Sequence, residues 1–217
     1  FKRSKLFDKV AKPRKGITTS DNDRYLRLWQ EVSASQFSPT NAENEDPRWR
    51  PVNKGGQFRR WFGNREVIID WKSDGKAIKE FDRAVVRNPN FYFREGLTWN
   101  DITSGTFAMR FSPADAMFEG KGPMAFTDSK EETIAFTAFF NTKVCRSLLA
   151  FLAPTINFNI GDVARVPILP EVTTNRETVR NGGRCIEIAR ADWDAYETSW
   201  DFTTLPLLSP DHRAETL

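Results

Sequence analysis

Short hydrophobic runs separated by turn residues dominate the chain from Gly55 onward. Val67-Ile68-Ile69, Phe91-Tyr92-Phe93 and the segment from Phe107 to Phe111 are rich in β-branched or aromatic residues, and Gly, Asn, Asp and Pro separate them. Runs of this kind are typical of strands joined by tight turns. The pattern predicts a twisted, mostly antiparallel β-sheet over residues 16–122.

The apolar residues take a helical spacing after Pro123. Ser129 is a suitable N-cap, because its side-chain oxygen can accept from a free backbone N–H, and acids follow in the first turn. Asn141-Thr142 can separate two helices, and Pro154 ends the second. The sequence therefore predicts a helical pair over residues 129–153, packed by apolar side chains with Phe139, Leu148 and Leu152 foremost: Ile134, Ala138, Phe139, Val144, Leu148, Leu149 and Leu152.

The other segments complete an α+β fold. Prolines, Asn and acids mark residues 36–51 as a loop, whereas residues 156–168 alternate like a closing strand around Gly161-Asp162. Residues 192–200 fit one short helix. We expect residues 1–15 to form a basic arm, residues 16–168 the main domain, and residues 169–217 a C-terminal connector.

Composition excludes several classes of protein. The chain has 217 residues, of which 39% are hydrophobic and 13% aromatic, so it can bury a core without needing disulfides or a structural metal. Two cysteines, Cys145 and Cys185, cannot build a disulfide framework or a four-cysteine zinc site. The single histidine, His212, is expected in a solvated tail, which removes most histidine-based catalysis. Residues 134–152 are interrupted by charges, so we expect no membrane span and a cytoplasmic protein.

The charge is divided unevenly along the chain. Residues 1–110 carry 22 Lys and Arg against 14 Asp and Glu, for a net +8, whereas residues 111–217 carry 10 against 15, for −5. A basic half beside an acidic half favours a domain that lays one surface on a polyanion and turns another toward protein. The chain begins with Phe1 and not Met, so we expect it to be a piece of a longer protein.

Two short matches resemble an adenine methyltransferase site. Asn88-Pro89-Asn90-Phe91 fits three positions of the NPP(Y/F) motif that grips a displaced adenine, and Phe118-Glu119-Gly120-Lys121-Gly122 fits the FxGxG loop for S-adenosylmethionine. A cofactor loop needs a helix directly after it, but Pro123 and Met124 lead into another β-like run. We therefore expect neither match to be functional, and we expect this chain to hold no cofactor and no metal.

A third match, Asp70-Trp71-Lys72, resembles the D-x-K end of a magnesium nuclease site. Carboxylates hold the metal in such a site, and Glu66 or Asp46 could supply another. The structural alternative is a strand end with a surface ion pair. We expect that alternative and keep the nuclease as a competing function.

Basic and aromatic residues alternate between Lys54 and Lys72. Adjacent glycines let the backbone approach a phosphate, and nearby Lys and Arg neutralise it. Arg and Asn in a loop can also read base edges, because Arg pairs with guanine and Asn with adenine. The alternative is a hairpin with its aromatic side chains packed inward and its Arg solvated.

Long segments of the chain resemble one known family. They are similar, in the same order, to the target recognition domain of large adenine-specific DNA methyltransferases of the PglX type, from BREX phage-defence systems, and to related fused restriction-modification enzymes. The segments are distributed along most of the chain: residues 16–25, 29–32, 54–64, 96–99, 157–168 and 192–202. The family usually has Gly where this chain has Ser20, which puts a positive-φ turn there in question.

The resemblance implies a non-catalytic DNA-reading module of a bacterial adenine-N6 methyltransferase. Its catalytic and S-adenosylmethionine motifs would lie in an upstream methyltransferase domain of the same polypeptide. The implied partners are double-stranded DNA, that domain and other defence-system subunits, with no membrane. A protein-interaction scaffold is the remaining alternative. The residues expected to contact DNA are Lys15, Asn22, Lys54, Gly55, Gly56, Arg59, Arg60, Asn64, Arg65, Lys72, Arg94, Thr98 and Arg110.

Overall fold

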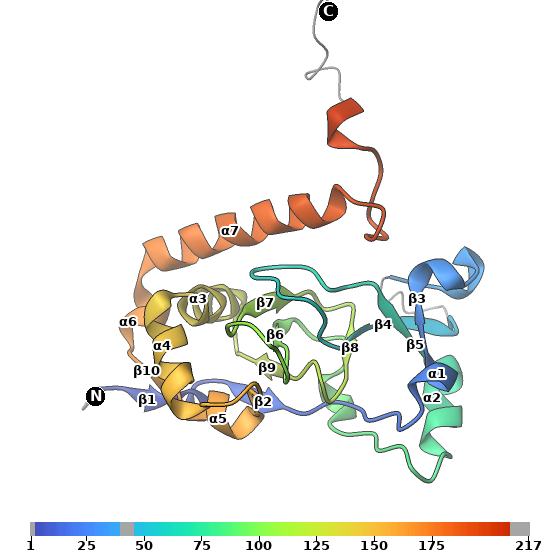
Figure 1. The fold of residues 1–217 in the computed structure, drawn as a ribbon, viewed down its shortest axis with the longest axis horizontal. Coiled ribbons are helices and arrows are strands. Elements are labelled where there is room, and N and C mark those ends of the chain that lie inside the picture. Colours follow the sequence, from blue (N-terminus) through green and yellow to red (C-terminus); the bar gives the residue numbers. More distant parts are fainter. Residues whose placement is uncertain (1–2, 40–45, 209–217) are drawn as a thin grey trace, which may run out of the picture.

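Two four-stranded sheets form the centre of the molecule in a computed structural model that describes residues 3–39 and 46–208 (Figure 1). One sheet has the order β2-β9-β6-β7 and is antiparallel throughout, and the other has the order β3-β5-β4-β8, in which β4 and β8 run parallel. The expectation of a mixed fold with mostly antiparallel sheets is confirmed. The strands are β1 (Lys5–Leu6), β2 (Lys12–Arg14), β3 (Leu26–Leu28), β4 (Trp49–Asn53), β5 (Val67–Asp70), β6 (Gly96–Trp99), β7 (Met109–Ser112), β8 (Met117–Phe118), β9 (Met124–Phe126) and β10 (Pro167–Ile168).

Both faces of the central strands are covered. Every residue of β4, β6, β7 and β9 is buried, so these strands do not show a polar face. Leu97 and Trp99 of β6 face a core shared with the helices, whereas Val52 and Ile69 belong to a second core between the other strands. A third cluster, which includes Phe62 and Trp193, lies under the longest helix.

Most helices gather at one end of the molecule, beside the first sheet, and one long helix runs across the top in Figure 1. The two helices predicted between Ser129 and Pro154 are present as α3 and α4, and the Ser129 side chain accepts from the backbone N–H of Glu132. The α-helices are α1 (Asn22–Tyr25), α2 (Lys72–Lys79), α3 (Lys130–Phe140), α4 (Lys143–Leu152), α5 (Ile160–Ala164), α6 (Glu171–Thr174) and α7 (Arg176–Asp194).

The packing of the helical pair differs from the prediction at one of its three foremost residues. Cys145 and Leu149 are fully buried. The predicted Phe139 and Leu152 are half-buried and pack against the same core, whereas Leu148 is half-buried and does not belong to that core. Residues four apart lie on one face of a helix, so the buried face is set by where the helix starts. The chain breaks at Asn141-Thr142 and restarts at Lys143, which turns Leu149 and not Leu148 toward the core.

Two predictions for the second half of the chain are wrong. The segment 156–168 contains the helix α5 and ends in the two-residue strand β10, so it is not one closing strand. Of the short helix predicted over residues 192–200, only residues 192–194 are helical, and they are the end of α7, which begins at Arg176. A Cβ on Gly182 would lie 3.0 Å from Ala138 of α3, so the glycine that argues locally against a helix allows α7 to pack closely on α3.

Two predictions for the first half are also corrected. Phe91 ends a 3-10 turn (Pro89–Phe91) and Phe93 has a φ of +57°, so residues 91–93 are not a strand. The basic arm contains β1 and β2, which pair with β10 and β9 on either side of a 3-10 turn (Phe7–Lys9), so the arm is built into the sheets. His212 and part of the 36–51 loop lie outside the described residues.

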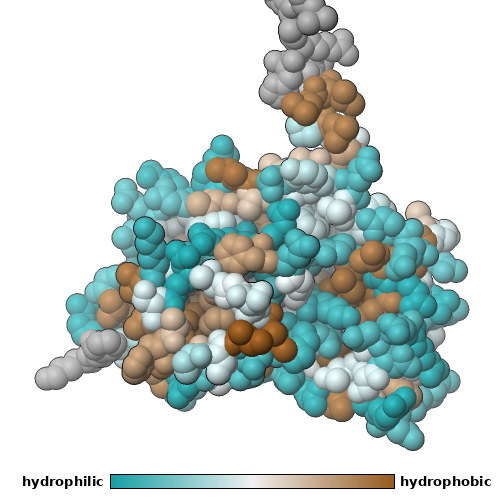
Figure 2. Space-filling view, in the orientation of Figure 1, coloured by the Kyte–Doolittle hydropathy of each residue, from teal (hydrophilic) through white to brown (hydrophobic). Residues whose placement is uncertain are grey.

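The segment after α7 crosses back over the molecule and then leaves it. Trp29 Nε1 donates to Thr198 O (3.0 Å), and the Trp200 ring packs against Phe37. Beyond it, Leu207 is 84% exposed, and the brown colour of this projecting segment in Figure 2 shows its apolar surface. No described helix is long and apolar enough to cross a membrane.

Candidate nucleic-acid interface

The loop of residues 54–66 between β4 and β5 carries many of the predicted DNA contacts, and its backbone is anchored at both ends. Asn100 Nδ2 donates to Gly56 O (2.6 Å), and Asn64 Nδ2 donates to Gln57 O (2.8 Å). At the other end, Trp61 N donates to Met109 O of β7 (3.0 Å). The tip, residues 57–60, is therefore held between fixed points.

The two glycines of this loop meet a conformational need. Gly55 and Gly56 have φ angles of +99° and +133°, which residues with a side chain rarely adopt. A Cβ on Gly56 would also lie 3.0 Å from the Asn64 amide that fixes the loop. Gly55 is buried and Gly56 is exposed, so only the second can offer its backbone to a ligand.

Three Lys-Gly pairs from distant parts of the sequence meet beside this loop. A Cβ on Gly16 would lie 1.8 Å from Phe118 O, and one on Gly122 would lie 2.5 Å from Asn53 O. Because the glycines have no side chain, the backbones of these segments can lie in direct contact. The lysine before each glycine is therefore placed near the other two lysines. We call these three lysines, Lys15, Lys54 and Lys121, the lysine cluster.

Glu119 lies among the lysine cluster. It is 6% exposed, and its carboxylate accepts from the backbone N–H of Lys121 (2.8 Å). Burial raises the pKa of Glu119, although that hydrogen bond and the positive charges of Lys54, Lys121 and Lys15 act in the opposite direction. Lys121 Nζ also pairs with Asp101 (3.1 Å). Lys15 and Lys121 are exposed and Lys54 is half-buried, so the cluster presents positive charge to solvent around a largely buried acid.

Sequence reasoning missed Lys121 as a candidate contact. It assigned this residue to the look-alike cofactor loop and left it out of the DNA-binding set. The third Lys-Gly pair of the chain, at residues 121–122, is the signal that could have found it.

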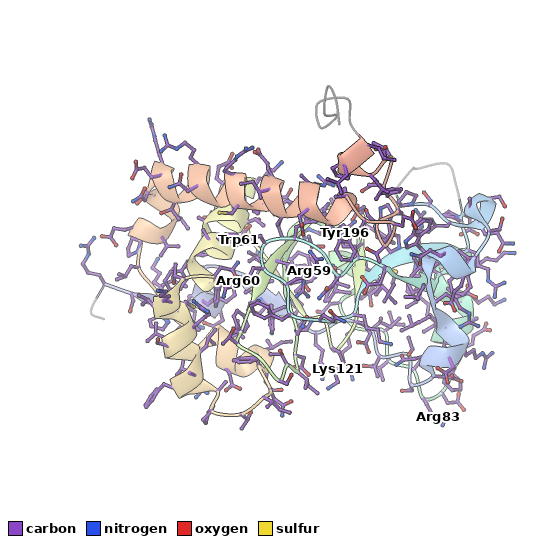
Figure 3. The ribbon with its side chains drawn as sticks, turned by 45° about the horizontal axis from the view of Figure 1, so that its top comes forward. Arg59, Arg60, Trp61, Arg83, Lys121 and Tyr196 are labelled. Atoms are coloured by element: carbon purple, nitrogen blue, oxygen red, sulfur yellow. The ribbon has the colours of Figure 1, made fainter. Side chains whose placement is uncertain are left out.

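Arg59 and Arg60 have different environments. Arg59 pairs with Asp192 (3.1 Å), and its guanidinium carbon lies 4.8 Å from the ring centroid of Trp193, so it ties the loop to α7. The Arg60 guanidinium carbon lies 5.3 Å from the ring centroid of Phe58, and no carboxylate among the described residues pairs with it. Figure 3 shows both arginines beside α7, with Lys121 further from the helix.

Four predicted contacts lie in the interior, where they cannot reach a phosphate. Arg110 is 2% exposed and donates to Asn100 Oδ1 (2.8 Å), and its Nε and Nη1 have no partner among the described residues. Burial lowers the pKa of Arg110 to about 10. Arg65 pairs with Asp115 (2.6 Å), and Thr98 donates to a backbone carbonyl. These three residues and Asn64 lie in the interior beneath the loop, and we do not include them in the interface.

The remaining predicted contacts lie elsewhere on the surface. Arg94 is exposed, and its guanidinium group lies over the ring of Phe91. The guanidinium group of Arg14 contacts the same ring. Exposed Lys72 is the first residue of α2, and exposed Asn22 is the first residue of α1. The positive-φ turn in question at Ser20 is formed, with a φ of +56°, and the Ser20 hydroxyl donates to Arg83 O (2.6 Å).

The cofactor look-alike has the local structure that its context predicted, and the other look-alike has a structural role. The segment after Gly122 enters strand β9 and not a helix. Asn88 has a φ of +52°, and its amide donates to Lys15 O (2.9 Å), so it holds the segment that carries Lys15.

The nuclease alternative does not fit the contacts of its carboxylates. Asp70 pairs with Arg48 (2.8 Å), and Asp46 accepts from the backbone N–H of Ser73 (3.1 Å). A guanidinium on the first carboxylate competes with a metal ion for the same oxygens. Among the described residues, no group of three His, Cys, Asp or Glu could hold a metal.

Comparison with known proteins confirms the resemblance found in the sequence. The chain is 36% identical over 214 residues to the adenine-specific methyltransferase PglX of Lacticaseibacillus casei (strain Zhang), covering 92% of the chain and 17% of that protein. It is 34% identical over 197 residues to the adenine-specific methyltransferase BrxX of Escherichia coli O9:H4 (strain HS), covering 89% of the chain and 16% of that protein. The chain thus spans about a sixth of the length of these relatives. No family model matches it.

Proposed function

We propose that this chain, which is homologous to a segment of the adenine-specific methyltransferases PglX and BrxX, is the target recognition module of a longer enzyme of that type. It binds double-stranded DNA and reads its sequence, and methyl transfer takes place elsewhere in the polypeptide. The observation that carries the proposal is the lysine cluster. Three ammonium groups brought together from distant segments around one largely buried acid suit a DNA phosphate.

The cluster and the loop tip have separate tasks in this proposal. Phosphate contacts fix the position of a protein on the duplex, and contacts to base edges read the sequence. Lys15, Lys54 and Lys121 make the first kind of contact. Arg60 is the candidate for the second kind, because it lies on an anchored tip without an acidic partner among the described residues, and a free guanidinium can bind guanine in a bidentate manner.

The rest of the enzyme supplies the chemistry and the cellular context. S-adenosylmethionine would bind in the methyltransferase domain, and we assign no cofactor to this chain. The acidic half, which includes α3 to α7, would face that domain or other defence-system subunits. The enzyme would act on cytoplasmic DNA in BREX phage defence or restriction-modification.

The test is to remove the lysine cluster and measure DNA binding against salt. The triple variant Lys15→Ala, Lys54→Ala, Lys121→Ala is compared with Lys5→Ala, Lys130→Ala, Lys143→Ala, which removes the same charge from exposed positions. Each lost phosphate contact should flatten the slope of log K against log salt by about 0.9. We expect a slope flatter by about 2 to 3 for the cluster variant and an unchanged slope for the control.

The outcome decides between two functions. Equal binding by both triple variants would show that the cluster is not the DNA face. The interaction-module alternative would then be preferred, and it has its own observation, because the exposed side chains of Val144 (66%), Phe151 (85%) and Leu207 (84%) offer apolar contact area. Thermal unfolding of both variants checks that the fold is retained.

A further inference from the structure

An aromatic ring stands exposed at the tip of the anchored loop. Phe58 is 47% exposed, although most phenylalanines of the described residues belong to the three cores. It lies between Gln57, whose carbonyl is fixed by Asn64, and the pair Arg59 and Arg60. An exposed aromatic side chain with positive charge beside it suits a ligand that is both flat and anionic.

The ring is also held in a defined place. The carbonyls of Gly56 and Gln57 accept from buried amides directly before Phe58, and Arg59 binds α7 directly after it. The guanidinium carbon of Arg60 lies 5.3 Å from the Phe58 centroid, so it supports the ring. A side chain fixed in this way loses little further conformational freedom on binding.

We propose that Phe58 is a wedge that enters the base stack of duplex DNA and fills the position left by a displaced base. The inference rests on the proposed function and adds a residue and a ligand to it: the π-face of a nucleobase beside a vacated position. An enzyme that modifies a base must take it out of the duplex, which costs unstacking energy. An apolar side chain inserted at the step recovers part of that stacking, and Arg60 would remain near the adjacent base edge.

The test measures binding to two duplexes of one sequence. One duplex is intact, and the other has an abasic site at its centre, where insertion no longer requires a base to leave. We expect the wild-type chain to bind the abasic duplex more tightly. We expect Phe58→Ala to weaken binding to the abasic duplex by about 5- to 150-fold, because the variant loses the stacking contact between the ring and a base. The variant should then bind both duplexes equally.

Three controls separate insertion from other effects. Phe151→Ala removes the same side chain from an 85% exposed site on α4 and should retain the preference. Phe58→Trp keeps a stacking ring and should also retain it. Phe58→Ala should leave the salt slope unchanged, because the ring makes no phosphate contact.

The results that overturn the wedge differ from those that overturn the proposed function. Three results would overturn the wedge alone, provided that the lysine-cluster variant still loses its salt-dependent binding. The wild-type chain could show no preference for the abasic duplex, the preference could survive Phe58→Ala, or Phe58→Ala could weaken binding to both duplexes equally. A wild-type chain that binds neither duplex would overturn both. A wild-type chain that binds DNA, with Phe58→Ala losing only binding to another protein domain, would assign the ring to a protein interface and overturn the wedge.

Discussion

Arg59 and Arg60 are neighbours in the sequence, yet their guanidinium groups have different partners. Arg59 contacts Asp192 and Trp193 of α7, whereas Arg60 contacts the exposed ring of Phe58. The contacts of the first lie within the protein. The Nε of the second is buried without a partner among the described residues, which leaves its terminal amino groups as the donors for a ligand.

The two arginines should therefore respond differently to truncation. Arg59→Ala should lower the free energy of unfolding by about 1 kcal/mol, because a partly exposed ion pair and a cation–π contact are lost. Arg60→Ala should change stability by less than about 0.5 kcal/mol and weaken binding of the parent enzyme to its target by about 1–3 kcal/mol. Urea unfolding and binding to cognate and scrambled duplexes measure both. The reverse pattern would contradict the assignment.

Glu119 should limit DNA binding at neutral pH. Its negative charge lies among the lysine cluster, and its pKa is raised chiefly by burial. As the pH falls through that raised pKa, the acid is neutralised and DNA affinity should increase. Glu119→Gln should bind DNA more tightly at pH 7 and should lack this increase. A titration of affinity from pH 7.5 to pH 5 compares the two proteins, and equal pH dependence would contradict the role given to Glu119.

Glu119 should also make stability depend on pH. Because its pKa is higher in the folded than in the unfolded chain, the folded protein binds more protons between those two values. The stabilising contribution is fully present below the unfolded pKa and is lost as the pH rises through the folded one. Glu119→Gln should therefore remove this part of the pH dependence.

At the scale of elements, α7 depends on a glycine pair with two different environments. A Cβ on Gly182 would lie 3.0 Å from Ala138 and 3.1 Å from Ile134 of α3, whereas a Cβ on Gly183 would meet nothing within 4 Å. The first glycine permits close packing of α7 on α3. The second only lowers helix propensity.

This difference gives a matched pair of variants. Gly183→Ala should stabilise the protein by about 0.5–1 kcal/mol, because alanine favours the helix and the site is open. Gly182→Leu should destabilise it by about 1–3 kcal/mol through overpacking, and Gly183→Leu is the control for side-chain size. Urea unfolding measures all three. Equal effects at the two positions would show that α7 does not pack on α3 through Gly182.

The same elements show what the sequence can predict. The start of α3 at Ser129 was predictable, because an N-cap and acids in the first turn act locally. The start of α7 carries the same kind of local signal, because Asn175 caps the helix and Glu177 follows in the first turn, but the pair Gly182-Gly183 argues locally against a long helix and the reason for Gly182 lies on α3. The candidate site divides in the same way. Lys54 and the glycines beside it could be found from composition, but the burial of Arg110 and the meeting of Lys121 with Lys15 depend on contacts between distant segments.

At the scale of the whole molecule, the proposed surface includes fewer basic residues than the sequence suggested. Arg65 and Arg110 are buried and Arg59 binds α7, which leaves six basic residues as candidates: Lys15, Lys54, Lys72, Lys121, Arg60 and Arg94.

With Arg60 assigned to a base edge, the other five residues can contact phosphates, which predicts a slope of log K against log salt of about −4.5. The isolated chain should bind DNA of any sequence with a Kd of roughly 10⁻⁴ to 10⁻⁶ M at physiological salt, and the parent enzyme should bind its target far more tightly. Fluorescence anisotropy over a series of salt concentrations measures the slope. A slope near zero would exclude a DNA-binding role for this surface.

The anchors of the loop tip lie outside the tip itself. Asn100, Asn64 and the backbone of Met109 hold residues 57–60 without using the side chains of those four residues, apart from Arg59. The tip can therefore be treated as an exchangeable cassette. If the tip reads DNA as proposed, transplanting residues 57–60 from a relative of different specificity, with Arg59 kept, should change the sequence that the parent enzyme recognises on an unaltered scaffold.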